Sequence, residues 1–282
     1  MNTINKQNSP HEELQGRKLY HYTTFENFVK IWLSKHLLLS SIENVNDFLE
    51  YKHTLEVNNP CCLPLTEAFD DVRKSFRQTS FTLDDGQTEG FKNPMMWGLY
   101  ANKAKGVCIE FDFNSLFTYY KDKEGVYDGF VRYHSKLPKL PRINKQKTIN
   151  DIKEYILSNK DAIMFTKFTA WEAENEYRII SDKISEIKIE NAISAVYLTS
   201  CLSSECIFVE KLLKNSDVPV WAFSVTTDML FSQIEIVNPQ ERREKIKESE
   251  QLNSQAKEYY QSLKNDSNAC LIMGSINKSK NI

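Results

Sequence analysis

The sequence lacks any hydrophobic run that could cross a bilayer. No apolar stretch approaches the roughly 20 residues that a transmembrane helix needs. The opening segment MNTINKQNSPHEELQGRK also has no hydrophobic centre of the kind found in signal peptides. The sequence therefore predicts a cytoplasmic protein with no membrane contact.

Metal-binding and disulfide motifs are missing as well. The six cysteines form no CxxC pair, and the five histidines form no HExxH motif. The cysteine spacing also fits no compact disulfide framework. We therefore expect reduced thiols and no dedicated metal site.

No charge of one sign predominates. The 36 Lys and Arg residues stand against 38 Asp and Glu residues, which leaves a formal net charge of -2. A field that would attract nucleic acid along the whole protein is therefore excluded, and any such contact must be local. The basic stretch 136–147 is one candidate, although a run of this kind is usually a solvated loop.

What the chain does have is enough apolar sequence for one sizeable core, since 41% of its 282 residues are hydrophobic. The composition predicts three parts. Residues 1–17 are polar and expected to be disordered. Residues 18–238 are expected to form a catalytic-like α+β domain. Residues 239–282 are highly charged and are expected to form a peripheral helix and tail, in which 239–264 could bind a neutralising or regulatory protein.

Apolar periodicity predicts a series of short helices and strands. Helical spacing occurs at 25–32, 46–56, 65–76, 95–102, 151–159 and 203–213. Strand patterns occur at 36–41, 76–82, 106–112, 127–134, 176–181, 184–189, 193–199, 218–225 and 231–237, with 127–134 as a hairpin-like partner of 106–112. We therefore expect an α+β fold with a mixed, mainly antiparallel sheet, which could be split, and flanking short helices.

Three short blocks carry the most distinctive residues. They are LYHYT at 19–23, MWGLYA at 96–101 before the strand GVCIEFD, and WEAENEYR at 171–178. Together with the pair Asn46-Asp47, they resemble the bacterial family of unknown function numbered 2971, over about residues 19–237. Phe48 stands where that family usually has proline after the Asn-Asp pair. The family name supplies no activity.

The order of these blocks also resembles that of ADP-ribosyltransferases, which use NAD as substrate. The resemblance implies an ADP-ribosyltransferase-like fold with His21 at a ribose hydroxyl and Thr23 beside it. It implies that Tyr22 and Tyr100 stack on the nicotinamide or adenine ring. Ser80, in the TSFT segment 79–82, would stand in for the hydroxyl-bearing middle strand.

The same resemblance makes Glu174-x-Glu176 the catalytic element. Cleavage of the nicotinamide–ribose bond passes through an oxocarbenium-like state, which a carboxylate stabilises. We assign that role to Glu176, and Glu174 is the candidate base for the incoming nucleophile. On an extended strand both side chains would share one face, and their repulsion could raise one pKa. Arg178 would continue that face and pair with a carboxylate or with the NAD pyrophosphate.

Each of these residues also has an ordinary structural interpretation. His21 could equally be a buried, hydrogen-bonded histidine, and the two glutamates could form a solvated strand edge with Arg178 as a surface ion pair.

The leading hypothesis is an NAD-dependent ADP-ribosyltransferase-like effector, a toxin or anti-phage factor. It would modify a macromolecular acceptor, protein or nucleic acid, or hydrolyse NAD. The alternatives are a non-catalytic binding module and a metal-dependent nucleic-acid enzyme that uses Asp47, Glu110 and Asp112.

Overall fold

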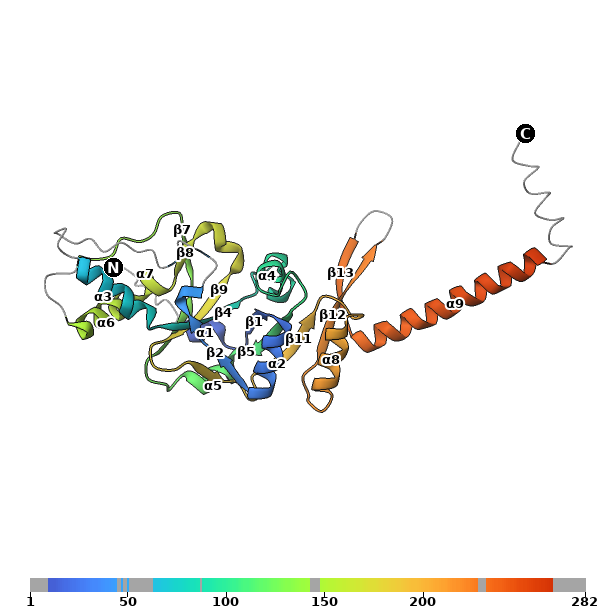
Figure 1. Cartoon of the computed structure of the whole chain (residues 1–282), viewed down its shortest axis with the longest axis horizontal. Helices are drawn as coiled ribbons and strands as arrows, with labels where there is room; N and C mark the ends of the chain where they lie inside the picture. The colour runs from blue at the N-terminus through green and yellow to red at the C-terminus, as the bar shows by residue number, and fades with distance from the viewer. Residues whose placement is uncertain are drawn as a thin grey trace, which may run out of the picture. The chain divides into compact units, whose positions relative to one another are not determined.

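The fold is described from a computed structural model (Figure 1), which covers residues 10–44, 47, 50, 63–86, 88–142, 148–227 and 232–265. The chain divides into two compact units, and each is described by itself. The first comprises residues 1–199 and 213–220, and the second comprises residues 200–212 and 221–282. The helix expected over 46–56 lies outside the described residues, apart from positions 47 and 50.

The first unit is built on an antiparallel sheet. Its strands follow the spatial order β11 (Ile193–Leu198), β5 (Val107–Asp112), β1 (Lys18–Thr23), β4 (Arg77–Thr82), β9 (Glu176–Ser181) and β6 (Val126–Phe130). The short strand β3 (Ser40–Ser41) also pairs with β4. Two further pairs lie apart from this sheet: β2 (His36–Leu38) with β10 (Glu186–Lys188), antiparallel, and β7 (Arg132–His134) with β8 (Thr166–Phe168), parallel. The predicted α+β class with a mixed, mostly antiparallel sheet is confirmed.

Short helices flank these strands. The α-helices of the first unit are α1 (Pro10–Leu14), α2 (Phe25–Ser34), α3 (Leu63–Lys74), α4 (Pro94–Leu99), α5 (Phe113–Tyr120), α6 (Ile149–Ser158) and α7 (Lys160–Met164). Short 3₁₀ helices occur at η1 (Ile42–Asn44), η3 (Gly90–Lys92) and η4 (Thr169–Glu174). The start of α2 is fixed by Thr24, whose hydroxyl accepts a hydrogen bond from the backbone N–H of Asn27 at 3.2 Å.

The sheet opens between β1 and β4. Strand β1 pairs with β5 along its whole length, but it pairs with β4 only at Tyr20 and Thr82. Strand β9 pairs with β4 along its whole length and so occupies one of its two edges. At the other end of β4, residues 77 and 78 pair with β3, which must therefore lie on the same edge of β4 as β1. Residues 79–81 of β4 therefore have no strand partner on the side of β1 among the described strands. We call this gap the strand opening.

A separate apolar cluster packs against strand β9 of the sheet. Buried residues of α3, α6 and α7 meet Ile180 of β9 there, with Phe69, Ile156 and Ile163 among the fully buried members. Met164 and Phe165 belong to the same cluster and lead directly into β8. This packing fixes the position of β8, which carries Lys167 into the site described below.

The second unit contains α8 (Ser204–Leu213), an antiparallel pair formed by β12 (Val220–Thr227) and β13 (Ser232–Val237), and the long helix α9 (Pro239–Asn265). The second unit therefore begins at residue 200, well before the charged helix that the sequence predicts after Pro239. Arg243 of α9 pairs with Glu210 and donates a hydrogen bond to the carbonyl of Cys201 at 2.8 Å. None of the helices in the part of the chain that the structure describes is long and apolar enough to span a membrane.

Two sequence-based expectations for the first unit differ from the structure. Residues 10–14, expected to be disordered, form α1, in which Leu14 is fully buried and His11 Nε2 lies 2.9 Å from Asp128 Oδ1. The hairpin expected between 106–112 and 127–134 is wrong. Helix α5 separates the two segments, and β6 pairs with β9 instead. The apolar residues of α5 were not recognised as a helix, so nearness along the chain was mistaken for pairing.

Two glycines provide a matched test of how tightly β1 is held. A methyl group on Gly106 would contact the backbone carbonyl of Thr23, which cannot move aside, whereas one on Gly98 in α4 would meet nothing within 4 Å. Gly106→Ala is expected to lower the free energy of unfolding by about 1–3 kcal/mol through overpacking. Gly98→Ala is expected to raise it by up to about 1 kcal/mol through helix propensity. Urea denaturation of both variants tests this, and equal effects would contradict the close approach at Gly106.

Candidate functional site

A cavity of about 580 Å³ lies at the strand opening. One part of its wall comes from α2, β2 and β3, and the rest comes mainly from β1, β4, β8, the ends of α4 and η4, and the start of β9. The resemblance to ADP-ribosyltransferases implies eight site residues, and seven of them line this cavity: His21, Tyr22, Thr23, Ser80, Tyr100, Glu174 and Glu176. Its volume falls within the range of about 300–1,000 Å³ that is typical of small-molecule sites.

His21 bridges the strand opening. Its Nδ1 lies 3.0 Å from the carbonyl oxygen of Ser80, which can only accept, so Nδ1 carries the proton of this bond. Burial lowers the pKa of the His21 ring, and the hydrogen bond to Ser80 offsets this only in part. The neutral ring therefore keeps Nε2 as an acceptor. That is the atom available for a sugar hydroxyl.

The two β1 residues that follow His21 are both buried. Tyr22 is buried: its hydroxyl donates to the carbonyl of Gly90 at 2.5 Å, and its ring packs edge-on against Trp97 at 5.2 Å. The Tyr22 ring is therefore already packed within the protein, which argues against its predicted stacking on a ligand. Thr23 is also buried, whereas Ser80 is half-buried on the opposite wall.

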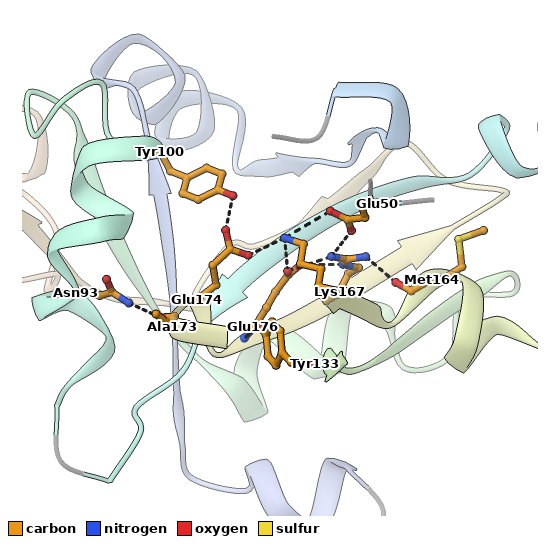
Figure 2. A network of polar contacts seen from close by, with 10 residues as sticks. Glu50, Asn93, Tyr100, Tyr133, Met164, Lys167, Ala173, Glu174 and Glu176 are labelled. Carbon is orange, nitrogen blue, oxygen red and sulfur yellow. Dashed lines mark hydrogen bonds and ion pairs between the residues drawn. The ribbon is translucent and has the colours of Figure 1, made fainter. Parts of the chain in front are cut away.

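A group of buried charged side chains adjoins the cavity (Figure 2), and three of its members, Lys167, Glu174 and Glu176, line it. We call this group the ion cluster, and its members are Glu50, Lys167, Glu174, Glu176 and Arg178. The Lys167 Nζ lies 2.6 Å from Glu174 Oε2, 2.8 Å from Glu176 Oε2 and 3.5 Å from Glu50 Oε2. Two cations thus meet three carboxylates in a region closed to water, where unpaired charges would be very costly.

Arg178 forms the inner part of the ion cluster. Its Nε and Nη2 bind the two oxygens of Glu176 at 2.7 and 3.0 Å, and Nη2 also lies 2.6 Å from Glu50 Oε1. Its Nη1 donates to the carbonyl of Met164 at 2.6 Å. Arg178 is 0% exposed and does not line the cavity. The predicted pairing with a carboxylate is present, but the side chain does not reach a position where it could meet a pyrophosphate.

The two glutamates of the Glu-x-Glu element do not lie on one extended strand. Glu174 ends η4, Asn175 adopts a left-handed conformation with φ of 44°, and Glu176 begins β9. The Asn175 side-chain amide holds this turn by donating to the carbonyls of Leu83 and Asp84 at 3.2 and 3.1 Å. The predicted reason for their nearness is therefore wrong, and Lys167 is what brings the carboxylates together.

The charges of the ion cluster set the acidities of its members. Burial by itself raises the pKa of Glu176, but Arg178 and Lys167 outweigh it and hold that pKa well below the usual value. The pKa of Glu50 is raised, because the effect of burial on it is larger than the opposing effect of the same two cations. We expected repulsion between Glu174 and Glu176 to raise one pKa. For Glu176 that expectation is wrong, because two cations contact its carboxylate.

The Tyr100 hydroxyl makes a contact that the resemblance does not imply. Tyr100 follows α4 at its C-terminal cap, is half-exposed, and donates a hydrogen bond from its hydroxyl to Glu174 Oε1 at 2.5 Å. Its ring remains on the cavity wall, so stacking on a ligand stays a prediction. Its hydroxyl is committed to the carboxylate.

Two of the acidic residues proposed for a metal-dependent enzyme, Glu110 and Asp112, bind groups of the protein itself. Glu110 is buried and accepts hydrogen bonds from Ser194 and Tyr197, each at 2.7 Å. Asp112 caps α5 by accepting from the backbone N–H of Ser115 at 2.9 Å. Over the described ranges, no group of three His, Cys, Asp or Glu residues could hold a metal ion. Asn46, of the Asn46-Asp47 pair, lies outside the described residues.

Two members of the ion cluster, Lys167 and Glu50, lie outside the recognised blocks. The position of Lys167 near the Trp171 block indicates that it could offset the carboxylates of that block, and it contacts both Glu174 and Glu176. Sequence reasoning missed Glu50. Tyr133 was missed too, although its hydroxyl accepts the backbone N–H of Glu176 at 2.9 Å. No local pattern identifies these residues, because each reaches the site through its own strand or loop.

Removing the Lys167 charge tests the energetic weight of the ion cluster. Lys167→Met leaves three buried carboxylates with Arg178 alone, and we expect a loss of about 3–5 kcal/mol in the free energy of unfolding. Lys74 pairs with Glu43 on the surface, so Lys74→Met should cost no more than about 1 kcal/mol. The double variant Lys167→Met/Glu174→Gln should recover part of the loss. Equal costs in the two single variants, measured by urea denaturation, would contradict this account.

The lowered pKa of Glu176 predicts an acid-dependent loss of stability. The stability contributed by its ionised form is present above the ordinary glutamate pKa of about 4.3 and is lost as pH falls toward the lowered value. Denaturation between about pH 5 and pH 2.5 should therefore show a steep decline in the wild type and a shallower one in Glu176→Gln. Parallel curves would show that Glu176 is not held ionised.

Comparison with known proteins agrees with part of the resemblance. Residues 96–179 match the family model described as "Protein of unknown function (DUF2971)". A search of the curated proteins finds no match to the chain. The matched segment begins with the MWGLYA block and ends in β9, so it contains four of the five members of the ion cluster, Lys167, Glu174, Glu176 and Arg178, together with Tyr100. The segment that supplies most of the ion cluster is therefore similar to this family of unknown function.

Proposed function

We propose that the protein is an NAD-consuming enzyme of the ADP-ribosyltransferase type, as the motif order and the open sheet suggest. It would break the bond between nicotinamide and ribose and pass ADP-ribose to a macromolecule or to water. The observation that carries the proposal is the convergence of His21, Tyr100, Glu174 and Glu176 on one cavity, although His21 and Glu176 are 155 positions apart in the sequence.

The charge state of Glu176 supports its proposed role. A carboxylate stabilises an oxocarbenium-like transition state only when it is ionised. The contacts with Arg178 and Lys167 keep Glu176 ionised and also fix its orientation, so it need not reorganise during the reaction. Glu176 is therefore suited to electrostatic stabilisation and unsuited to proton abstraction.

The opposite wall supports recognition of a sugar. The neutral His21 ring offers Nε2 as an acceptor, while Nδ1 is occupied by Ser80. A ribose hydroxyl that donates to Nε2 would hold the sugar in the same cavity that Glu176 lines.

The biological role and the partners belong to the proposal as well. A toxin or anti-phage effector that consumes NAD would require control by another protein. The charged and largely exposed helix α9 is the segment that we propose for such a neutralising or regulatory contact. The acceptor could be a protein or a nucleic acid.

Binding and turnover of NAD test the proposal directly. NAD at a hundred times its dissociation constant should stabilise the protein by about 2.7 kcal/mol, which thermal denaturation can detect. Purified protein should release nicotinamide from NAD, and Glu176→Gln should reduce the rate at least about 100-fold, as loss of an electrostatic stabiliser does. Glu154→Gln, on the exposed face of α6, is the matched control and should behave as wild type.

Two results would contradict this function. A non-catalytic binding module would show neither stabilisation by NAD nor release of nicotinamide. Wild-type turnover by a folded Glu176→Gln variant, checked by its melting curve, would show that another group stabilises the transition state.

A further inference from the structure

Glu174 lines the cavity but exposes very little of its carboxylate to it. It is 2% exposed, and both of its carboxylate oxygens are already occupied. Oε1 accepts from the Tyr100 hydroxyl at 2.5 Å, and Oε2 accepts from Lys167 Nζ at 2.6 Å. The Tyr100 hydroxyl therefore lies directly against one oxygen of the Glu174 carboxylate at the wall of the cavity (Figure 2).

The contact between Tyr100 and Glu174 is held rigidly by its surroundings. Asn93 caps α4, since its side-chain oxygen accepts from the backbone N–H of Met95 at 3.0 Å. The side-chain nitrogen of the same residue donates to the carbonyl of Ala173 at 2.6 Å. One residue thus ties the helix that precedes Tyr100 to the turn that carries Glu174. The two groups are positioned independently of any ligand.

We propose that Tyr100 is a catalytic residue that relays a proton from the acceptor to Glu174. This inference rests on the proposed function and assigns the base reaction within it. The hydroxyl of the half-buried Tyr100, which lines the cavity, would contact the acceptor, and Glu174 would be the proton's destination. Lys167 would hold the second oxygen of Glu174 and so keep the first directed at Tyr100.

The reaction balances without any further reagent. As the bond between ribose C1′ and the nicotinamide nitrogen breaks, its electron pair goes to the ring, and neutral nicotinamide leaves. An oxygen of the acceptor forms the new bond to C1′. Its proton passes to the Tyr100 oxygen, while the Tyr100 proton passes to Glu174 Oε1. Tyr100 is thereby unchanged, and Glu174 carries the proton until it is returned to solvent.

The acceptor class follows from this arrangement. The relay is needed only by a nucleophile that must lose a proton, such as water or a hydroxyl group. A nucleophile that is already an anion would not use it. This difference separates a relay from a purely structural or stacking role of Tyr100.

The test compares Tyr100→Phe with the wild type. The variant keeps the ring but lacks the hydroxyl, so stabilisation by NAD should be retained. Nicotinamide release with water or a hydroxyl acceptor should fall at least about 100-fold, the lower range for loss of acid–base catalysis. Tyr155→Phe is the matched control. It removes a tyrosine hydroxyl that donates to Pro141, distant from the cavity lining, and should leave the rate within about twofold.

Azide ion then separates the possible roles. Because azide carries no proton, it should restore nicotinamide release in Tyr100→Phe but not in Glu176→Gln. Wild-type turnover by Tyr100→Phe, loss of its NAD binding, or failure of azide rescue would each overturn the relay while leaving the proposed function intact. A wild-type protein that neither binds nor cleaves NAD would overturn both.

Discussion

The site depends on the burial of five charged groups next to one another. Arg178 has no exposure to solvent, and it would be prohibitively costly there without the carboxylates of Glu50 and Glu176. Those carboxylates in turn need both Arg178 and Lys167. Because each member requires the others, the ion cluster forms only when β8, β9, η4 and Glu50 have come together.

The second constraint is the incomplete pairing of β4. On the edge that faces β1, one residue pairs with β1 and two pair with β3. The stretch between them pairs with none of the strands that the structure describes. Unpaired main-chain groups inside a protein need other partners, and the carbonyl of Ser80 obtains one from His21. The cavity is therefore a consequence of how the sheet is paired, and the ion cluster adjoins it.

These two features give two neighbouring glutamates different chemistry. Glu176 is bound by two cations, which hold it ionised and fixed in orientation. Glu174 shares Lys167 with it but turns its other oxygen to Tyr100. Similar residues two positions apart thus have different surroundings, which is how proteins commonly divide the roles of paired carboxylates. The left-handed Asn175 between them makes the division possible.

The sequence by itself determined the local elements and the principal candidates for the site. The alternation in GVCIEFD identified β5, the helical spacing after Thr24 identified α2, and the motif blocks led to His21, Tyr100, Glu174 and Glu176. Such patterns are readable because they depend on neighbours within a few residues along the chain. Tertiary structure alone decided the pairing of β6 with β9, the strand opening, and the entry of Lys167 and Glu50 into the ion cluster. These features depend on contacts between distant segments, and the free energy of burying a charge is set by partners that no local pattern contains.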